Sequence, residues 1–289
     1  MGRGGADKMS TDEQSPTAWQ PLTPRGVAAF ARARLGRLLV VQLLVALLAA
    51  GAIAWTVYTG WFRVITTAID RMPAHGNIRD GALMWEGDSP QTLAENRFLA
   101  ITIDLKHEGQ ARSPAHVQVE FGRAYLKVFS LLGFVAAPYP RAYVIAFNRP
   151  ELVPWWGAWA PPLLALVVVA VIVGLFVTWA SLATLYCGIA WLCGFFANRQ
   201  LNLRESWRLS GAALMPGALL MTGAIILYGL GLLDPVRLLL VAALHFVVGW
   251  VYVCLSPLYQ PRHPAAPPPS RLNPFDNAKK SNRKSEKAS

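Results

Sequence analysis

Residues 155–197 read WWGAWAPPLLALVVVAVIVGLFVTWASLATLYCGIAWLCGFFA, a stretch without a single charged side chain. Three other stretches, 38–61, 211–233 and 236–258, are almost uncharged. A helix of about twenty apolar residues spans the hydrocarbon core of a bilayer, which is about 30 Å thick. The sequence therefore predicts an α-helical integral membrane protein with about four transmembrane helices.

The length of the apolar block leaves two arrangements open, two short helices or one helix of about 60 Å. Two spans would place Arg199, Arg204 and Arg208 outside, together with the basic C-terminal tail. One span places both groups in the cytoplasm, where lysine and arginine concentrate beside membrane helices. The charges therefore predict one span, with both termini cytoplasmic. Its helix either continues beyond the bilayer or breaks near 178–181.

The composition supports this class, because 54% of the residues are hydrophobic and only 15% are charged. The net charge of +11 resides largely in the two tails, and basic tails beside membrane helices contact anionic lipid. Membrane lipid is therefore the expected partner, and nucleic acid is not. The cysteines lie within apolar stretches, and the segment between the first two spans has no Asn-x-Ser/Thr sequon. Both features suit the bacterial inner membrane.

The predicted organisation treats the first span as an uncleaved anchor, with a signal peptide cleaved near Ala52-Ile53-Ala54 as the alternative. The segments are a disordered basic cytoplasmic tail (1–36), transmembrane helix 1 (37–61), an extracytoplasmic α+β domain (62–154), the long apolar block as helix 2 (155–198), helix 3 (211–233), helix 4 (236–258) and a disordered Pro-rich basic cytoplasmic tail (259–289).

The segment between the first two spans changes its periodicity from helix to strand. Apolar residues at helical spacing over 62–72 predict a short amphipathic helix that continues from the membrane. Alternation of apolar and polar residues then predicts strands at 82–86, 99–105, 117–121, 124–129 and 142–147, with a hairpin turn at Gly122-Arg123. The result is a small, mainly antiparallel β domain over about 73–150.

The sequence contains no recognised catalytic motif and no metal-ligand spacing. His107, Glu108 and His116 are close in sequence but do not follow a known metal pattern, so no metal or cofactor is predicted. Glu86 and Asp88 bring two carboxylates together across Gly87, where a plain turn is the stronger interpretation. These two carboxylates are the candidates for catalysis if the chain is an enzyme.

Within the spans, His245 is the one ionisable side chain well inside an apolar stretch, and such residues are candidates for a proton path or a ligand site. A neutral imidazole bonded to a neighbouring helix is the favoured interpretation. Pro216 and Gly217 mark a second candidate region near the start of the third span. Small residues recur at helical spacing on several spans, which favours a compact helical bundle that could also pack against a second copy or another membrane protein.

Two short motifs resemble those of a family of uncharacterised bacterial multi-pass membrane proteins, some of them linked to maltodextrin utilisation. One is Met72-Pro73 followed by Ile78-Arg79-Asp80-Gly81-Ala82-Leu83, and the other is Arg208-Leu209-Ser210 followed by Met215-Pro216. The resemblance implies an extracytoplasmic domain between an N-terminal span and a C-terminal group of spans. It implies no catalytic residue.

Three functions are therefore considered. The leading hypothesis is a non-enzymatic membrane protein whose extracytoplasmic β domain binds or senses a ligand or a partner. The second is a transporter or channel component with His245 near the path. The third is a membrane-embedded enzyme that acts on a lipid or envelope substrate.

Overall fold

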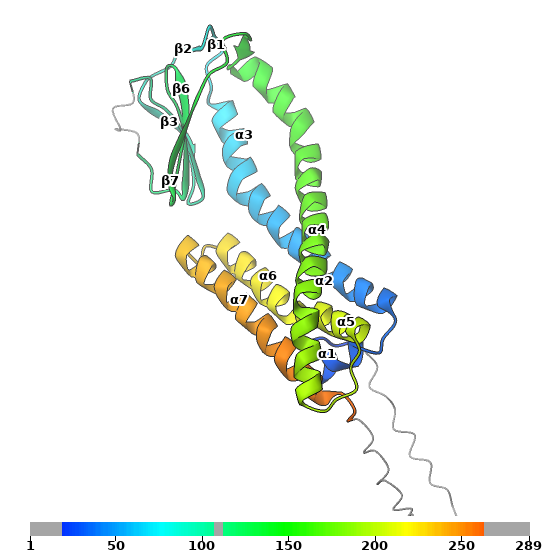
Figure 1. Ribbon diagram of the computed structural model, residues 1–289. Helices are drawn as coiled ribbons and strands as arrows, with labels where there is room; N and C mark the ends of the chain where they lie inside the picture. The colour runs from blue at the N-terminus through cyan, green and yellow to red at the C-terminus, as the bar shows by residue number, and fades with distance from the viewer. Residues whose placement is uncertain (1–18, 107–111, 263–289) are drawn as a thin grey trace, which may run out of the picture.

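The computed structural model describes residues 19–106 and 112–262, and it combines apolar helices with a small β-sheet domain (Figure 1). Among these described residues, four helical segments are long and apolar enough to cross a membrane: Leu35–Asp70, Arg149–Phe196, Leu203–Gly229 and Pro235–Tyr259. This agrees with the predicted fold class and with a membrane-associated chain. The helices are α1 (Pro24–Phe30), α2 (Leu35–Val57), the π-helical segment η1 (Tyr58–Phe62), α3 (Arg63–Asp70), α4 (Arg149–Phe196), α5 (Leu203–Ala213), α6 (Met215–Gly229), α7 (Pro235–Leu255) and the 3₁₀ helix η2 (Ser256–Tyr259).

The first apolar helix continues beyond the expected span, because α2, η1 and α3 follow one another without a break. This confirms the amphipathic helix predicted after residue 61. Val64, Ala68 and Ile69 of α3 are buried, while the other face of the helix is exposed. The helix therefore connects the apolar bundle directly to the core of the β domain.

The long apolar block is a single helix, α4, with no break at 178–181. It begins at Arg149, inside the segment that the sequence assigns to the outer domain, because Asn148 caps it by accepting a hydrogen bond from the Glu151 amide at 3.1 Å. Pro150, in its first turn, also favours a helix start there. The first turns of α4 lie against α3, where the Trp156 indole donates to Thr66 Oγ1 at 2.9 Å.

The apolar stretch predicted as the third span, 211–233, is preceded by helical residues, because α5 begins at Leu203. The reason is a capping box: the Asn202 side chain accepts from the Glu205 amide at 2.9 Å, and the Glu205 carboxylate accepts from the Asn202 amide at 3.0 Å. Arg208, within this helix, donates to the carbonyl of Ala33 at 3.0 Å. The charged residues before the apolar run are therefore helical and pack against the N-terminal segment.

The β domain contains two sheets, ordered β2-β1-β8 and β3-β4-β5-β6-β7. The pairs are antiparallel except for β4–β5, which is parallel. The strands are β1 (Gly76–Arg79), β2 (Ala82–Trp85), β3 (Gln91–Glu95), β4 (Leu99–Ile103), β5 (Val117–Phe121), β6 (Tyr125–Ser130), β7 (Gly133–Pro138) and β8 (Ile145–Ala146).

The predicted strands at 82–86, 99–105, 117–121 and 124–129 are confirmed, with ends that shift by one or two residues. The strand at 142–147 shortens to β8, and the sequence did not predict β1, β3 or β7. The β5–β6 turn also differs, because the Gly122 amide donates to the Tyr125 carbonyl at 3.0 Å. Arg123 and Ala124 are therefore its central residues.

Two separate apolar cores result. One lies in the helical bundle and includes Phe30, Leu38, Leu209 and Met215. The other fills the β domain between the sheets and α3, with Leu93 and Ile103 fully buried. The site described below lies where the β domain meets the turn between α6 and α7.

Candidate functional site

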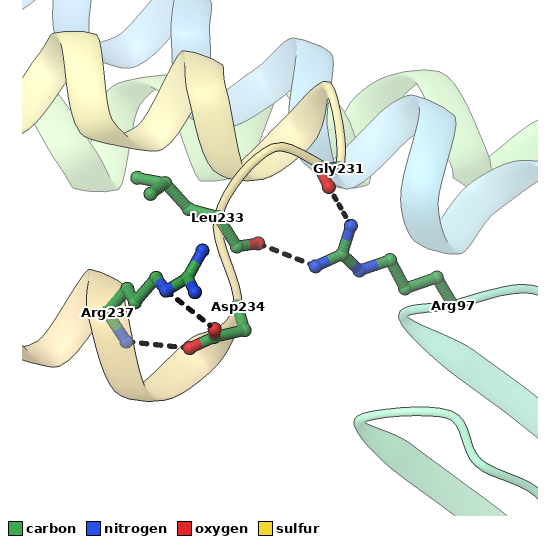
Figure 2. Close-up of polar contacts among 5 residues, drawn as sticks. All are labelled: Arg97, Gly231, Leu233, Asp234 and Arg237. Carbon is green, nitrogen blue, oxygen red and sulfur yellow. Dashed lines mark hydrogen bonds and ion pairs between the residues drawn. The ribbon is translucent and has the colours of Figure 1, made fainter.

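Arg97 joins the β domain to the turn between α6 and α7. Its two terminal nitrogens donate to the carbonyls of Gly231 and Leu233, the latter at 2.8 Å (Figure 2). These carbonyls follow the C-terminal end of α6, where unpaired carbonyls and the helix dipole favour a cation. Gly231 has a φ of +79°, a conformation that glycine adopts without strain. The carbonyls after α6 therefore suit the positive charge of Arg97, and Gly231 lets the backbone present them without strain.

A short turn between β3 and β4 holds Arg97 in place. The side-chain oxygen of Asn96 accepts from the amides of Phe98 and Leu99 at 2.8 and 2.9 Å. The Asn96 amide group donates to the carbonyl of Gly60 in η1 at 2.9 Å. Arg97 thus projects from a turn that is itself tied to the first apolar helix.

The other side of the contact is fixed by the start of α7. The Asp234 carboxylate caps this helix by accepting from the Arg237 amide at 2.8 Å, and it also pairs with the Arg237 guanidinium at 3.2 Å (Figure 2). The α6–α7 turn therefore presents its carbonyls to Arg97 in a defined conformation.

An aromatic cluster lies beside Arg97. The His116 Nδ1 atom is 2.9 Å from the Tyr228 hydroxyl, and the two rings are stacked with centroids 5.6 Å apart. Phe98 packs edge-on against both rings, at 5.1 Å from Tyr228 and 5.7 Å from His116. Gly60 lies beneath Phe98, since a Cβ atom there would be 3.0 Å from the Phe98 ring. The cluster thus joins β-domain residues to α6 and η1.

Burial lowers the pKa of the His116 imidazole below its usual value of 6.5, and the nearby Arg97 guanidinium lowers it further, while the Asp234 carboxylate opposes both. Nδ1 and the Tyr228 hydroxyl are within hydrogen-bond distance, and a neutral imidazole has one ring nitrogen that can accept a hydroxyl hydrogen. Because the pKa is depressed in the docked state, the undocked state binds more protons, and docking is fully stabilised only above about pH 6.5.

We therefore expect the β domain to dock less tightly as the pH falls from about 7.5 to about 5. After correction for the intrinsic pH dependence of amide exchange, the protection factors of the 112–121 segment should fall over this range. The variant His116→Gln cannot titrate, so its protection factors should show no step near pH 6. An equal step in both proteins would assign the pH dependence to another group.

A cavity of about 800 Å³ adjoins this contact, between the sheet and the start of α7. Pockets of this size accommodate small organic ligands. Side chains of β5 and β6 form its polar wall, and Pro235 and Val236 of α7 lie on the other side. The cavity is lined by Arg112, Ser113, Pro114, Ala115, His116, Gln118, Glu120, Lys127, Phe129, Ser130, Leu131, Gly133, Phe134, Pro235 and Val236.

The polar wall follows from the alternation of β5. Val117, Val119 and Phe121 contact the core of the domain, so Gln118 and Glu120 point to the opposite face. Both are nevertheless buried, at 6% and 4% exposure. The Gln118 side chain donates to Thr102 Oγ1 at 3.1 Å and accepts from the Ser113 amide at 3.0 Å. These bonds hold the Gln118 side chain in one position within the wall.

The structure brings together three of the residues singled out in the sequence. Gly217 of α6 lies against His245 of α7, because a Cβ atom on Gly217 would be 2.6 Å from the His245 carbonyl oxygen. Pro216 stands in the first turn of α6 beside it. The His245 ring contacts the Ala242 carbonyl of its own helix and lines a second cavity of about 140 Å³ with mostly apolar walls.

Glu86 and Asp88 lie elsewhere, exposed in the turn that follows β2. The Asp88 carbonyl accepts a hydrogen bond from the Trp85 indole at 3.1 Å, which fits the interpretation as a turn. His107 and Glu108 lie outside the described residues. Among residues 19–106 and 112–262, no three histidine, cysteine or acidic side chains are grouped so that they could hold a metal ion.

Sequence reasoning missed the contact around Arg97, Tyr228 and Asp234. Arg97 lies in a loop without a periodic pattern. Tyr228 lies in an apolar run, where nothing in the sequence distinguishes a functional tyrosine from one that only packs. The Asp234-Pro235 pair was the available signal, because it is a typical helix start. No family, curated protein or solved structure matches this chain, so the resemblance to the bacterial multi-pass family stays an expectation.

Proposed function

We propose that this chain is a non-enzymatic bacterial inner-membrane protein whose extracytoplasmic β domain binds a small ligand. The observation that carries this proposal is the cavity of about 800 Å³ shared by the β domain and α7. The basic tails support cytoplasmic termini. Because one span precedes the β domain, that domain then lies outside. The four apolar helices support the membrane location.

The chemistry of the lining points to an amphiphilic anion as the ligand. Arg112 and Lys127 supply two cations and His116 supplies a neutral imidazole, against the single carboxylate of Glu120. The rings of Phe129 and Phe134 supply apolar surface in the same cavity. Cationic side chains attract a phosphate or carboxylate group, while the aromatic rings suit an acyl or ring portion. An anionic phospholipid has this combination.

Ligand binding would be sensed through the contact between the domain and the helices. A ligand in this cavity contacts β5 and β6 on one side and the first residues of α7 on the other. His116 belongs both to the cavity and to the cluster with Tyr228. Occupancy would therefore favour the docked arrangement by binding it more tightly than the undocked one.

The test uses the full chain in detergent with dioctanoyl phosphatidylglycerol, which is anionic, or dioctanoyl phosphatidylcholine, which is zwitterionic. We expect phosphatidylglycerol to raise the apparent unfolding midpoint, since a ligand at a hundred times its Kd stabilises by about 2.7 kcal/mol. Lys127→Gln should reduce this shift and Arg79→Gln, on β1 away from the cavity, should not. Equal shifts from the two lipids, or no effect of Lys127→Gln, would refute anion recognition.

The two alternatives have less support. His245 lines a small, mainly apolar cavity, and the described residues around that cavity include no carboxylate, whereas proton-coupled carriers use such groups. Glu86 and Asp88 lie exposed in a turn and away from the residues that line the larger cavity. A binding module therefore accounts for more of the structure than a carrier or an enzyme does.

A further inference from the structure

The β6–β7 hairpin ends in two leucines that have almost no protein around them. Leu131 and Leu132 form the two-residue loop between the paired residues Ser130 and Gly133. Leu132 is 98% exposed and Leu131 is 67% exposed. Such loops are usually built from glycine, asparagine or aspartate. Two leucines at this position therefore place apolar side chains where turn chemistry does not require them.

The exposed apolar surface continues from the loop along β7. Phe134 and Val135 are 64% and 70% exposed, and all six residues of β7 are exposed. β7 is also the edge strand of its sheet. An apolar tip and edge of this kind in water would be an aggregation site, so such surfaces are normally covered in the native state.

The hairpin tip lies close to the outer ends of the apolar helices. Leu131 and Phe134 line the same cavity as Pro235 and Val236, the first residues of α7. In Figure 1 the lower end of the larger sheet, where β7 is labelled, lies above the upper ends of α6 and α7. The exposed apolar face of α7, which includes Leu239 and Leu240, begins at this level. The hairpin thus continues the surface that the helices present to lipid.

From this continuity we propose that the tip of the β6–β7 hairpin, Leu131 and Leu132, inserts into the outer leaflet of the membrane. Apolar side chains of peripheral elements reach roughly 5–10 Å into the boundary between headgroups and acyl chains. The membrane would then cover the tip, and the Arg97 contact would fix the other side of the domain. This anchor does not depend on the proposed ligand.

A fluorescent depth measurement tests the anchor in the full chain. The native cysteines Cys187, Cys193 and Cys254 are replaced by alanine, and a single cysteine at Leu132 carries an NBD group. The protein is reconstituted in phosphatidylcholine vesicles with doxyl-labelled lipids. We expect a blue-shifted emission that is quenched more strongly by doxyl groups near the headgroup than by those at the bilayer centre. Iodide in the water should quench it weakly.

The matched control places the same probe at Asp88, which is exposed at the turn after β2 and should behave as a probe in water. If the Leu132 probe shows the emission and iodide quenching of the Asp88 probe, the anchor does not exist. A blue-shifted emission that doxyl lipids do not quench, and that is lost when protein is diluted in lipid, would also overturn it. That result would assign the hairpin to contact with a second copy. The experiment uses phosphatidylcholine alone and no anionic lipid. Its outcome is therefore independent of whether an anionic ligand binds in the cavity.

Discussion

Replacing Gly217 by alanine should destabilise the helical bundle by about 1–3 kcal/mol, because the added methyl group cannot fit between α6 and α7. Its Cβ atom would lie 2.6 Å from the His245 carbonyl oxygen and 3.8 Å from the Gly249 amide nitrogen. Both are backbone atoms, so relief requires that a whole helix moves. Close approach through small residues is how helices pack in lipid. The measurement is the apparent thermal unfolding midpoint of the detergent-solubilised chain.

Gly223→Ala is the matched control on the same helix. A Cβ atom at Gly223 would have no neighbour within 4 Å, and alanine is favoured over glycine in a helix interior by up to about 1 kcal/mol. The midpoint of this variant should therefore equal or slightly exceed that of the unaltered chain. If Gly217→Ala also left the midpoint unchanged, the close contact between α6 and α7 would be wrong.

The second large effect is expected for Arg97→Ala, which removes both hydrogen bonds to the α6–α7 turn. Hydrogen bonds to a charged group contribute up to about 3 kcal/mol. Arg97 is exposed, so solvent screening makes the contribution of these bonds smaller. A loss of about 1–2 kcal/mol would raise the undocked population roughly 5- to 30-fold. The distance distribution between spin labels at Asp88 and Leu203 should then broaden.

Arg79→Ala serves as the control for the loss of one arginine from the same domain. Arg79 is exposed on β1, in the smaller sheet, and makes no described contact with α6 or α7. Its spin-label distribution should match that of the unaltered chain. Equal distributions for Arg97→Ala and the unaltered chain would mean that the domain is held by something other than the Arg97 contact.

Much of the fold could be predicted because two of its features leave a local pattern in the sequence. Lipid-crossing helices require long apolar runs, and half-buried strands such as β4 and β5 require alternation. β7 was missed because residues 133–138, GFVAAP, do not alternate, and both faces of this strand are exposed. β3 was missed because it is short, polar and interrupted by an irregularity between Thr92 and Ala94.

Helix ends could not be read from apolar runs alone. An apolar run marks the part of a helix that meets lipid, while the helix itself begins where its first amides are capped. Asn202 and Glu205 form the capping box that moves the third helix start to Leu203, and this signal was present in the sequence. For α4, Asn148 followed by Arg149-Pro150 was a comparable signal.

The candidate site depends on contacts between segments that are distant in the sequence. Arg97 and Gly231 are separated by 134 positions, and His116 and Tyr228 by 112. No local pattern marks such pairs. Gly217 and His245 were each recognised as unusual, yet their direct contact across α6 and α7 follows only from the packing of the helices.

The most direct test of the account is the labelling of single cysteines in intact bacterial cells with a membrane-impermeant maleimide. One cysteine replaces Asp88, in the β domain, and another replaces Leu203, which is 60% exposed at the start of α5. If the β domain is extracytoplasmic and α4 crosses the membrane once, Asp88→Cys is labelled in intact cells and Leu203→Cys only after permeabilisation. Labelling of both sites in intact cells, or of Leu203→Cys alone, would contradict the proposed arrangement.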